Sequence, residues 1–255
     1  MSLNEKVALI TGGARGIGRA TALRFAREGT KIIIADLDEN GLEETKRLIA
    51  DAGGEAVSVV ADVSSRNDVQ RLVETSVSTF NAFHILINNA GITRDGLTTR
   101  LKDGEPQFMS DEKWDAVLNV NLKGTWLCCQ MAAVQMIRQG YGRIVNTASI
   151  AAVGNIGQAN YSASKAGIIG LTRTLALEWA RYGITVNCIA PGGVKTPMTE
   201  TIPEKVMSGL IESIPLKRFA EAEEIAAVHA FLASDDAAYI TGQVLFVDGG
   251  LSTGA

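Results

Sequence analysis

The sequence contains few of the residues on which metal, disulfide and hydrolytic chemistry depend. Among 255 residues there are three cysteines and two histidines. No two of Cys128, Cys129 and Cys188 have the spacing of a zinc site, and an odd count does not fit a secreted disulfide framework. His84 opens an apolar run, and His229 lies within the apolar segment AAVHAFLAS. We therefore expect buried free thiols, structural histidines, no metal site and no histidine-based hydrolytic triad.

Long apolar runs and an excess of positive charge are also missing. No stretch approaches the roughly 20 apolar residues that span a bilayer, and the start MSLNEKVALITGG lacks the uninterrupted apolar run of a signal peptide. The formal net charge of −4 argues against a general nucleic-acid binder. Hydrophobic residues make up 46% of the chain, enough for a sizeable core. These features predict a cytoplasmic globular protein without a membrane or nucleic-acid partner.

Short apolar runs rich in β-branched residues alternate with longer helical patterns along the chain. We expect strands at 7–11, 31–35, 56–61, 84–88, 142–148, 184–190 and 243–248. We expect helices at 16–28, 40–52, 66–80, 112–138, 159–181 and 221–233. Strict alternation with continuously apolar strands is typical of a parallel sheet covered by helices on both faces. The pattern predicts an α/β single-domain Rossmann fold, with a doubly wound parallel sheet of about seven strands.

No proline-rich or serine-rich linker divides the chain, so residues 1–255 are predicted to form one domain. A cofactor-binding half would extend to about residue 140 and a catalytic half from about 141 onward. Two connections interrupt the alternation: the polar segment 92–111 and the mixed segment 191–220. Long connections in compact domains are often functional lids or binding loops.

The first expected strand leads directly into a glycine-rich turn that contains Gly12, Gly16 and Gly18. A strand, such a turn and a helix form the frame of a dinucleotide site, where glycines let the backbone approach a pyrophosphate at the helix N-terminus. Asp36 ends the second strand, where a carboxylate accepts hydrogen bonds from ribose hydroxyls and repels a 2′-phosphate. Although Arg15 could help to hold a 2′-phosphate, Asp36 predicts NAD(H) rather than NADP(H).

Tyr161 and Lys165 are separated only by small residues in the sequence YSASK. On a helix this spacing places both side chains on one face, about 5–6 Å apart at Cβ. Because such a pair often occurs by chance, the spacing alone allows either a surface tyrosine beside a surface lysine or a reactive pair.

Motifs along essentially the whole chain resemble the short-chain dehydrogenase/reductase family. They are TGGARGIG (11–18), ADVS (61–64), NNAG (88–91), Asn121 in NVNLKG, Ser149 in NTASI, YSASK (161–165), PGGVKTPM (191–198) and VDGG (247–250). The segments GNIGQANYSASKAG and NAGITRDGL are most similar to bacterial 3-oxoacyl-acyl-carrier-protein reductases and their relatives. The resemblance implies hydride transfer between a nicotinamide cofactor and a carbinol carbon. It also implies a homotetramer in which the helices 112–138 and 159–181 pair between subunits.

The resemblance implies four catalytic residues. Tyr161 would be the acid/base, and the charge of Lys165 would lower its pKa while the same ammonium group binds the nicotinamide ribose. Ser149 would hold the substrate oxygen, and Asn121 would anchor a water that links Lys165 to solvent. Ser164 is a competitor for the role of Ser149, but on a helix it is expected to point away from the Tyr161 face.

The cofactor contacts implied by the resemblance and by the glycine-rich turn come from every part of the predicted carboxyl edge of the sheet. They are Gly12, Arg15, Gly16, Ile17, Gly18, Asp36, Leu37, Asp62, Val63, Asn89, Ala90, Gly91, Tyr161, Lys165, Pro191, Gly192, Val194 and Thr196.

The chain departs from the family pattern in two segments. The loop 150–160 is one residue shorter than in familiar members, which is expected to reshape the substrate wall. The connection 92–113 is longer, and its added part, KDGEPQFM (102–109), is expected to form a solvated loop or a hairpin at the active-site rim or a subunit contact. Apolar residues are expected to line the substrate region: Ile150, Val153, Ile156, Val194, Met198, Ile202 and Met207.

The sequence therefore predicts an NAD(H)-dependent oxidoreductase that interconverts a secondary alcohol and a ketone. A 3-oxoacyl-acyl-carrier-protein or acyl-CoA reductase is the alternative, with an acyl carrier protein as a possible partner. A non-catalytic nucleotide-binding regulatory protein on the same fold is a remote second alternative.

Overall fold

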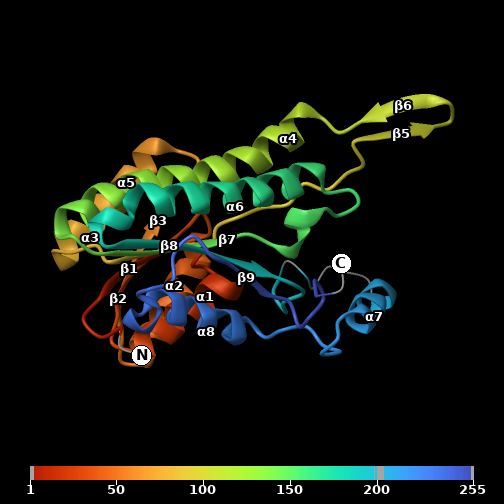
Figure 1. The fold of residues 1–255 in the computed structure, drawn as a ribbon. Helices are drawn as coiled ribbons and strands as arrows, with labels where there is room; N and C mark the ends of the chain where they lie inside the picture. The colour runs from red at the N-terminus through yellow and green to blue at the C-terminus, as the bar shows by residue number, and fades with distance from the viewer. Residues whose placement is uncertain (1–2, 198, 200–203, 254–255) are drawn as a thin grey trace.

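The computed structural model describes residues 3–197, 199 and 204–253. Its main sheet has the strand order β3-β2-β1-β4-β7-β8-β9, and all neighbouring strands run parallel (Figure 1). The strands are β1 (Val7–Thr11), β2 (Lys31–Asp36), β3 (Glu55–Val60), β4 (Ile85–Asn88), β7 (Gly142–Thr147), β8 (Ile184–Pro191) and β9 (Val244–Val247). The predicted fold class is confirmed, whereas the division into halves near residue 140 stays a prediction.

Helices cover both faces of this sheet (Figure 1). One face carries α1 (Gly16–Arg27), α2 (Glu39–Asp51) and α8 (Ala222–Ala233), and the other carries α3 (Arg66–Phe80), α5 (Gly124–Gln139) and α6 (Ala159–Trp179). Each face has its own apolar core, with Phe25 fully buried in one and Phe83 fully buried in the other. Burying such a side chain contributes about 1.5–3 kcal/mol, so both layers hold the sheet edge that carries the site.

The expected helix 112–138 is interrupted in the structure. It consists of α4 (Asp111–Val117), a π-helical segment over Leu118–Lys123, and α5. Asn121 lies fully buried in the π-helical segment, and its carbonyl accepts a hydrogen bond from Thr125 Oγ1 at 2.7 Å. The prediction of an uninterrupted α-helix was wrong because apolar periodicity does not distinguish a regular α-helix from one that contains a π-helical turn. Such turns are frequent at functional sites.

The two long connections contain elements that the periodicity did not place. The segment 92–113 contains an antiparallel hairpin, β5 (Thr99–Lys102) and β6 (Glu105–Phe108), which projects from the body beyond α4 (Figure 1). Of the two forms expected for the added part 102–109, the structure shows the hairpin, which spans 99–108 with Asp103 and Gly104 in its turn. Its place at the active-site rim or at a subunit contact stays a prediction. The segment 191–220 contains the helix α7 (Glu204–Ser213), which the sequence analysis missed.

The histidines and cysteines have structural positions, as predicted. His84 Nδ1 accepts a hydrogen bond from the Val7 amide at 3.0 Å. All three cysteines are free and buried, and burial raises the pKa of the Cys128 thiol to about 12. Within the described ranges, no three histidine, cysteine or acidic side chains gather as a metal site requires, and no helix is long and apolar enough to cross a bilayer.

The stability of the fold is expected to fall in acid because of His229. This buried residue hydrogen-bonds the hydroxyls of Thr21 and Thr147, at 2.9 and 3.4 Å, and burial lowers its pKa to about 3. Between pH 6.5 and pH 3 the unfolded chain binds a proton here and the folded chain does not. The contribution of neutral His229 to the free energy of unfolding is therefore complete above pH 6.5. Below that pH it is lost at up to about 1.4 kcal/mol per pH unit.

Urea unfolding at pH 7.5, 6.0 and 5.0 measures this effect. The His229→Gln variant cannot take up the proton, so its free energy of unfolding is expected to depend less steeply on pH than that of the wild type. Equal slopes for the two proteins would show that His229 titrates alike in both states.

Candidate active site

The predicted site residues meet at the carboxyl edge of the parallel sheet. Gly12 follows β1, Asp36 ends β2, Asp62 follows β3, Asn89 follows β4 and Ser149 follows β7. Since β1 lies between β2 and β4 in the sheet, the strand order reverses direction at β1 and β4. Doubly wound sheets bind nucleotides in the crevice at such a switch point, so the topology supports a dinucleotide site here.

Gly12 and Gly18 in the glycine-rich turn have no room for a side chain. Gly12 adopts a φ of +68°, and a Cβ placed there would lie 2.8 Å from Asn89 Nδ2. A Cβ on Gly18 would lie only 1.9 Å from the carbonyl oxygen of Gly12. Gly16, with a φ of +56°, begins α1 and faces Thr196. The turn therefore exposes backbone at a helix N-terminus, which fits the pyrophosphate of a dinucleotide.

Asp36 is held in place by the backbone around it. Its carboxylate accepts hydrogen bonds from the amides of Ala14, Leu37 and Asp38, at 3.2, 2.8 and 3.2 Å. The side chain is half-buried, beside the glycine-rich turn, whereas Arg15 is exposed at the N-cap of α1. One of these amides, that of Ala14, belongs to the glycine-rich turn, so the turn itself helps to fix the carboxylate. The neighbouring Leu37 is exposed.

The residues predicted to contact the cofactor after β3 and β4 also brace the crevice, and their contact with the cofactor stays a prediction. Asp62 Oδ1 accepts hydrogen bonds from the amide and hydroxyl of Ser64, at 2.8 and 2.7 Å. Val63 is buried against Gly124, where a Cβ would lie 2.8 Å from Val63 Cγ2. Asn89 Nδ2 donates to the carbonyls of residues 11 and 12, both at 3.3 Å, so its side chain braces the glycine-rich turn.

The segment after β8 forms the opposite wall. Gly192 packs against Asp248, since a Cβ on it would lie 2.8 Å from Asp248 Cα. Val194 is buried in the apolar core, so the expectation that its side chain lines the substrate region was wrong. The Thr196 amide donates to Thr199 Oγ1 at 3.0 Å. Met198 and Ile202, also expected in the lining, lie outside the described residues.

Tyr161 and Lys165 lie on the first turns of α6, as the spacing predicts. Lys165 is buried, with its Nζ 5.5 Å from the centre of the Tyr161 ring, and it donates a hydrogen bond to the Thr147 carbonyl at 2.7 Å. Ser149 begins a short 3₁₀ turn, where its Oγ accepts from the Ala151 amide at 3.1 Å and lies within hydrogen-bond reach of the tyrosine. The burial of Lys165 excludes the interpretation of a surface tyrosine beside a surface lysine and favours a reactive pair.

The pKa of Tyr161 is raised in the structure, whereas the sequence analysis predicted that it is lowered. Burial has the largest effect and raises the pKa of Tyr161, the hydrogen bond with Ser149 opposes it, and the charge of Asp95 adds to the rise. Burial also lowers the pKa of Lys165 to about 8, so the ammonium form still predominates at pH 7. The prediction failed because burial of the phenol outweighs any effect of the lysine, whose ammonium group hydrogen-bonds the Thr147 carbonyl.

Asn121 contacts the backbone that follows the NNAG motif. Its Oδ1 accepts from the Ile92 amide at 2.8 Å, and its Nδ2 donates to the Ile92 carbonyl at 3.0 Å. Gly91 lies between Asn121 and Lys165, because a Cβ on it would be 3.3 Å from the amide oxygen and 3.6 Å from Nζ. Ser164 is buried here and accepts from Asn121 Nδ2 at 3.1 Å, so it supports Asn121 rather than competing with Ser149.

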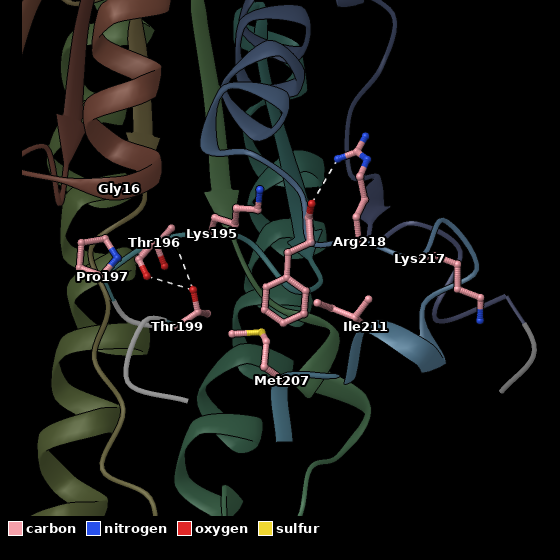
Figure 2. A pocket seen from close by; sticks show the side chains of 10 residues that line it. Gly16, Lys195, Thr196, Pro197, Thr199, Met207, Ile211, Lys217 and Arg218 are labelled. Atoms are coloured by element: carbon pink, nitrogen blue, oxygen red, sulfur yellow. Dashed lines mark hydrogen bonds between the residues drawn. The ribbon is translucent and has the colours of Figure 1, made fainter. Parts of the chain in front are cut away.

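A cavity of about 630 Å³ opens between the glycine-rich turn and α7 (Figure 2). Its walls combine apolar side chains of α7 with cationic and hydroxyl groups from the neighbouring loops. The lining consists of Gly16, Lys195, Thr196, Pro197, Thr199, Met207, Ile211, Lys217, Arg218 and Phe219. Of the predicted apolar lining, Met207 is present here, whereas Val153 and Ile156 are exposed on the rim loop.

Three contributors to the site were missed by the sequence analysis. The Thr147 carbonyl holds Lys165, Asp95 acts on the pKa of Tyr161, and Asn160 hydrogen-bonds two distant carbonyls. A main-chain carbonyl leaves no signal in a sequence. Asn160 had one, since a polar residue directly before the tyrosine was visible in NYSASK.

Comparisons with known proteins agree with this geometry. A family model described as enoyl-(acyl carrier protein) reductase matches residues 12–252. Over 252 residues the chain is 46% identical to a 3-oxoacyl-acyl-carrier-protein reductase of Thermotoga maritima, covering 98% of this chain and 99% of that protein. It is 42% identical over 252 residues to a hydroxy(phenyl)methylsuccinyl-CoA dehydrogenase subunit of Thauera aromatica, covering 99% and 98% of the two chains. The crystal structure of levodione reductase matches 99% of each chain with a TM-score of 0.91 and 39% identity. The chain therefore belongs to the short-chain dehydrogenase/reductase family of oxidoreductases.

Proposed function

We propose that the protein is an NAD(H)-dependent oxidoreductase that interconverts a secondary alcohol and a ketone, with Tyr161 as the general acid/base. The observation that carries the proposal is the cluster of Tyr161, Ser149 and buried Lys165 at the same sheet edge as the glycine-rich turn. A bound nicotinamide would supply or accept the hydride, which is the part of the chemistry that side chains cannot perform.

The protein's residues would manage the proton and the substrate oxygen. Tyr161 donates its phenolic proton to a ketone oxygen, or takes the proton of an alcohol, while Ser149 binds the same oxygen. The ammonium group of Lys165, 5.5 Å from the centre of the Tyr161 ring, would favour the phenolate during turnover and so oppose the rise in pKa that burial causes. Asn121 would hold the water that returns the proton to solvent.

The arrangement of Asp36 supports NAD(H) as the cofactor. Its carboxylate is fixed by the amides of Ala14, Leu37 and Asp38, so it could not easily move away from a 2′-phosphate. A carboxylate at the end of the second strand pairs with ribose hydroxyls and repels that phosphate.

The substrate class is narrowed by the cavity and by the relatives. Met207, Ile211 and Phe219 form an apolar wall, which supports a hydrophobic substrate. Two of the most similar relatives are named for acyl-carrier-protein and CoA thioesters, so reduction of a 3-oxoacyl thioester is the second candidate function. A cytoplasmic location and an acyl carrier protein partner stay hypotheses beside it, whereas membership of an oxidoreductase family disfavours the remote alternative of a non-catalytic nucleotide-binding regulatory protein.

Self-association is supported by an exposed apolar groove of about 360 Å³ on the outer helical layer, lined in part by Leu122, Trp126 and Leu171. The homotetramer that the family resemblance implies would cover this groove, and sedimentation velocity would test it.

A matched panel of substrates and cofactors tests the function. The panel consists of acetoacetyl-CoA, cyclohexanone and 2-octanone, each assayed with NADH and with NADPH. We expect the protein to turn over at least one of them, with a kcat/KM at least tenfold higher with NADH than with NADPH. The Asp36→Ala variant should narrow that preference, because removing the carboxylate relieves repulsion of the 2′-phosphate and also removes a ribose acceptor. A strong preference of the wild type for NADPH would refute the argument from Asp36.

A further inference from the structure

Asn160 occupies a buried position directly before the proposed acid/base. It is fully buried, although it belongs to the first turn of α6 and is polar. Its Oδ1 accepts a hydrogen bond from the Tyr161 amide at 2.7 Å. Its Nδ2 donates to the carbonyls of Arg94 and Lys113, both at 3.1 Å. One side chain thus satisfies three backbone groups that are far apart in the sequence.

The two carbonyls are the two ends of the connection that carries the hairpin. Arg94 follows the NNAG motif closely, and Lys113 lies in the first turn of α4. Around the same point the Gly96 amide donates to the carbonyl of residue 157 at 2.8 Å, and Gln158 Nε2 donates to Asp95 Oδ2 at 3.0 Å. The start of the connection therefore lies along the loop that leads into the catalytic helix, and Asn160 is the buried centre of these contacts.

We propose that Asn160 is a positioning residue, which fixes Tyr161 in its reacting position by joining the catalytic helix to both ends of the connection 94–113. The proposal rests on the proposed role of Tyr161 as acid/base. Asn160 itself does not touch the reacting atoms. It acts through the backbone of Tyr161 and through Arg94 and Lys113, and the side-chain amide provides the two donors and the acceptor that this requires.

The chemistry of the amide explains why a close replacement would fail. An aspartate has the same shape and keeps the acceptor for the Tyr161 amide, but it has no donor for the two carbonyls. Its charge would also face two carbonyl oxygens in a buried place. An alanine removes all three bonds without introducing a charge. Both changes release the connection from the helix, and a displacement of about 1 Å at a catalytic group can cost about a hundredfold in rate.

The test compares Asn160→Asp and Asn160→Ala with the wild type, using NADH with acetoacetyl-CoA and cyclohexanone. We expect kcat to fall at least tenfold in both variants, while the Kd for NADH, measured by its fluorescence, stays within twofold. Asn67→Asp is the matched control for an exposed asparagine on α3, and it should behave as the wild type. Full activity of Asn160→Asp would overturn the proposal, because the donors would then be unnecessary.

A second variant separates the junction at Asn160 from the hairpin. The Met109 amide donates to the Thr98 carbonyl at 3.1 Å, so residues 99–108 can be replaced by Asn-Gly without disturbing the ends of the connection. This variant should keep the wild-type kcat. A loss as large as that of Asn160→Asp would assign the effect to the hairpin and overturn the proposal.

The remaining outcomes are also decisive. If both Asn160 variants lose NADH binding and their folded circular-dichroism spectrum, Asn160 serves the stability of the fold and the proposal fails. If Tyr161→Phe retains turnover, the proposed function fails. If Tyr161→Phe is inactive while Asn160→Asp and Asn160→Ala are fully active, only the role of Asn160 is refuted.

Discussion

Replacing Tyr161 by phenylalanine is expected to lower kcat at least a thousandfold and to leave the Kd for NADH within threefold. The change removes the hydroxyl and keeps the ring, so the packing of α6 is preserved. General acid/base catalysis contributes about 10²–10⁴ in rate, and the phenylalanine ring has no proton to transfer. Lys165 remains bonded to the Thr147 carbonyl, so the cofactor side of the site should be unaffected.

Steady-state kinetics with NADH, together with NADH fluorescence titration, measures both quantities. Tyr239→Phe is the matched control, since Tyr239 is fully exposed, and it should show no change. If Tyr161→Phe loses NADH binding as well as turnover, the tyrosine would be needed for the architecture of the cofactor site and not for proton transfer alone. Unchanged turnover would refute the mechanism.

Replacing Gly18 by alanine is expected to raise the Kd for NADH at least tenfold and to destabilise the fold by about 2–3 kcal/mol. The added Cβ would lie 1.9 Å from the Gly12 carbonyl oxygen and 2.9 Å from Asn89 Nδ2. Neither contact can be relieved by a rotamer change of the alanine, so α1 and the glycine-rich turn must separate. That separation displaces the backbone amides that would bind the pyrophosphate.

Urea unfolding and NADH fluorescence together check this result. Gly53→Ala is an informative control, because Gly53 has a φ of +78° and an added Cβ would meet no atom within 4 Å. It should cost about 1–2 kcal/mol through backbone strain and leave the Kd for NADH unchanged. A Gly18→Ala variant with wild-type NADH affinity would show that the turn can open without harm to the site.

The sheet and the glycine-rich turn were predictable because each depends on local sequence. The runs 7–11 and 184–190 are mostly apolar and rich in β-branched residues, and the strands β1 and β8 that they form are buried on both faces. Gly12 and Gly18 were found because glycines placed between a strand and a helix are typical of a dinucleotide-binding turn. The hairpin's exact start was not predictable, since its strands are almost wholly exposed and lack an alternating pattern.

The parts of the site that depend on distant contacts were not predictable. The π-helical segment at Asn121 is associated with two hydrogen bonds to Ile92, which is 29 residues away in the chain. The pKa of Tyr161 was misjudged because spacing gave the distance to Lys165 but not the direction of its Nζ or the cost of burial. The helix α7, in contrast, had a local signal that was overlooked, because Met207, Leu210 and Ile211 recur at helical spacing.

The burial of all three thiols makes the protein effectively cysteine-free towards alkylating reagents. Burial raises the pKa of Cys188 to about 11 and that of Cys128 to about 12, and it raises the pKa of Cys129 as well. A cysteine introduced at Asp103, on the exposed hairpin turn, would therefore react alone with a maleimide dye. The wild-type chain thus already provides the background for attaching a single fluorophore or surface anchor at the hairpin turn, without removing any native cysteine.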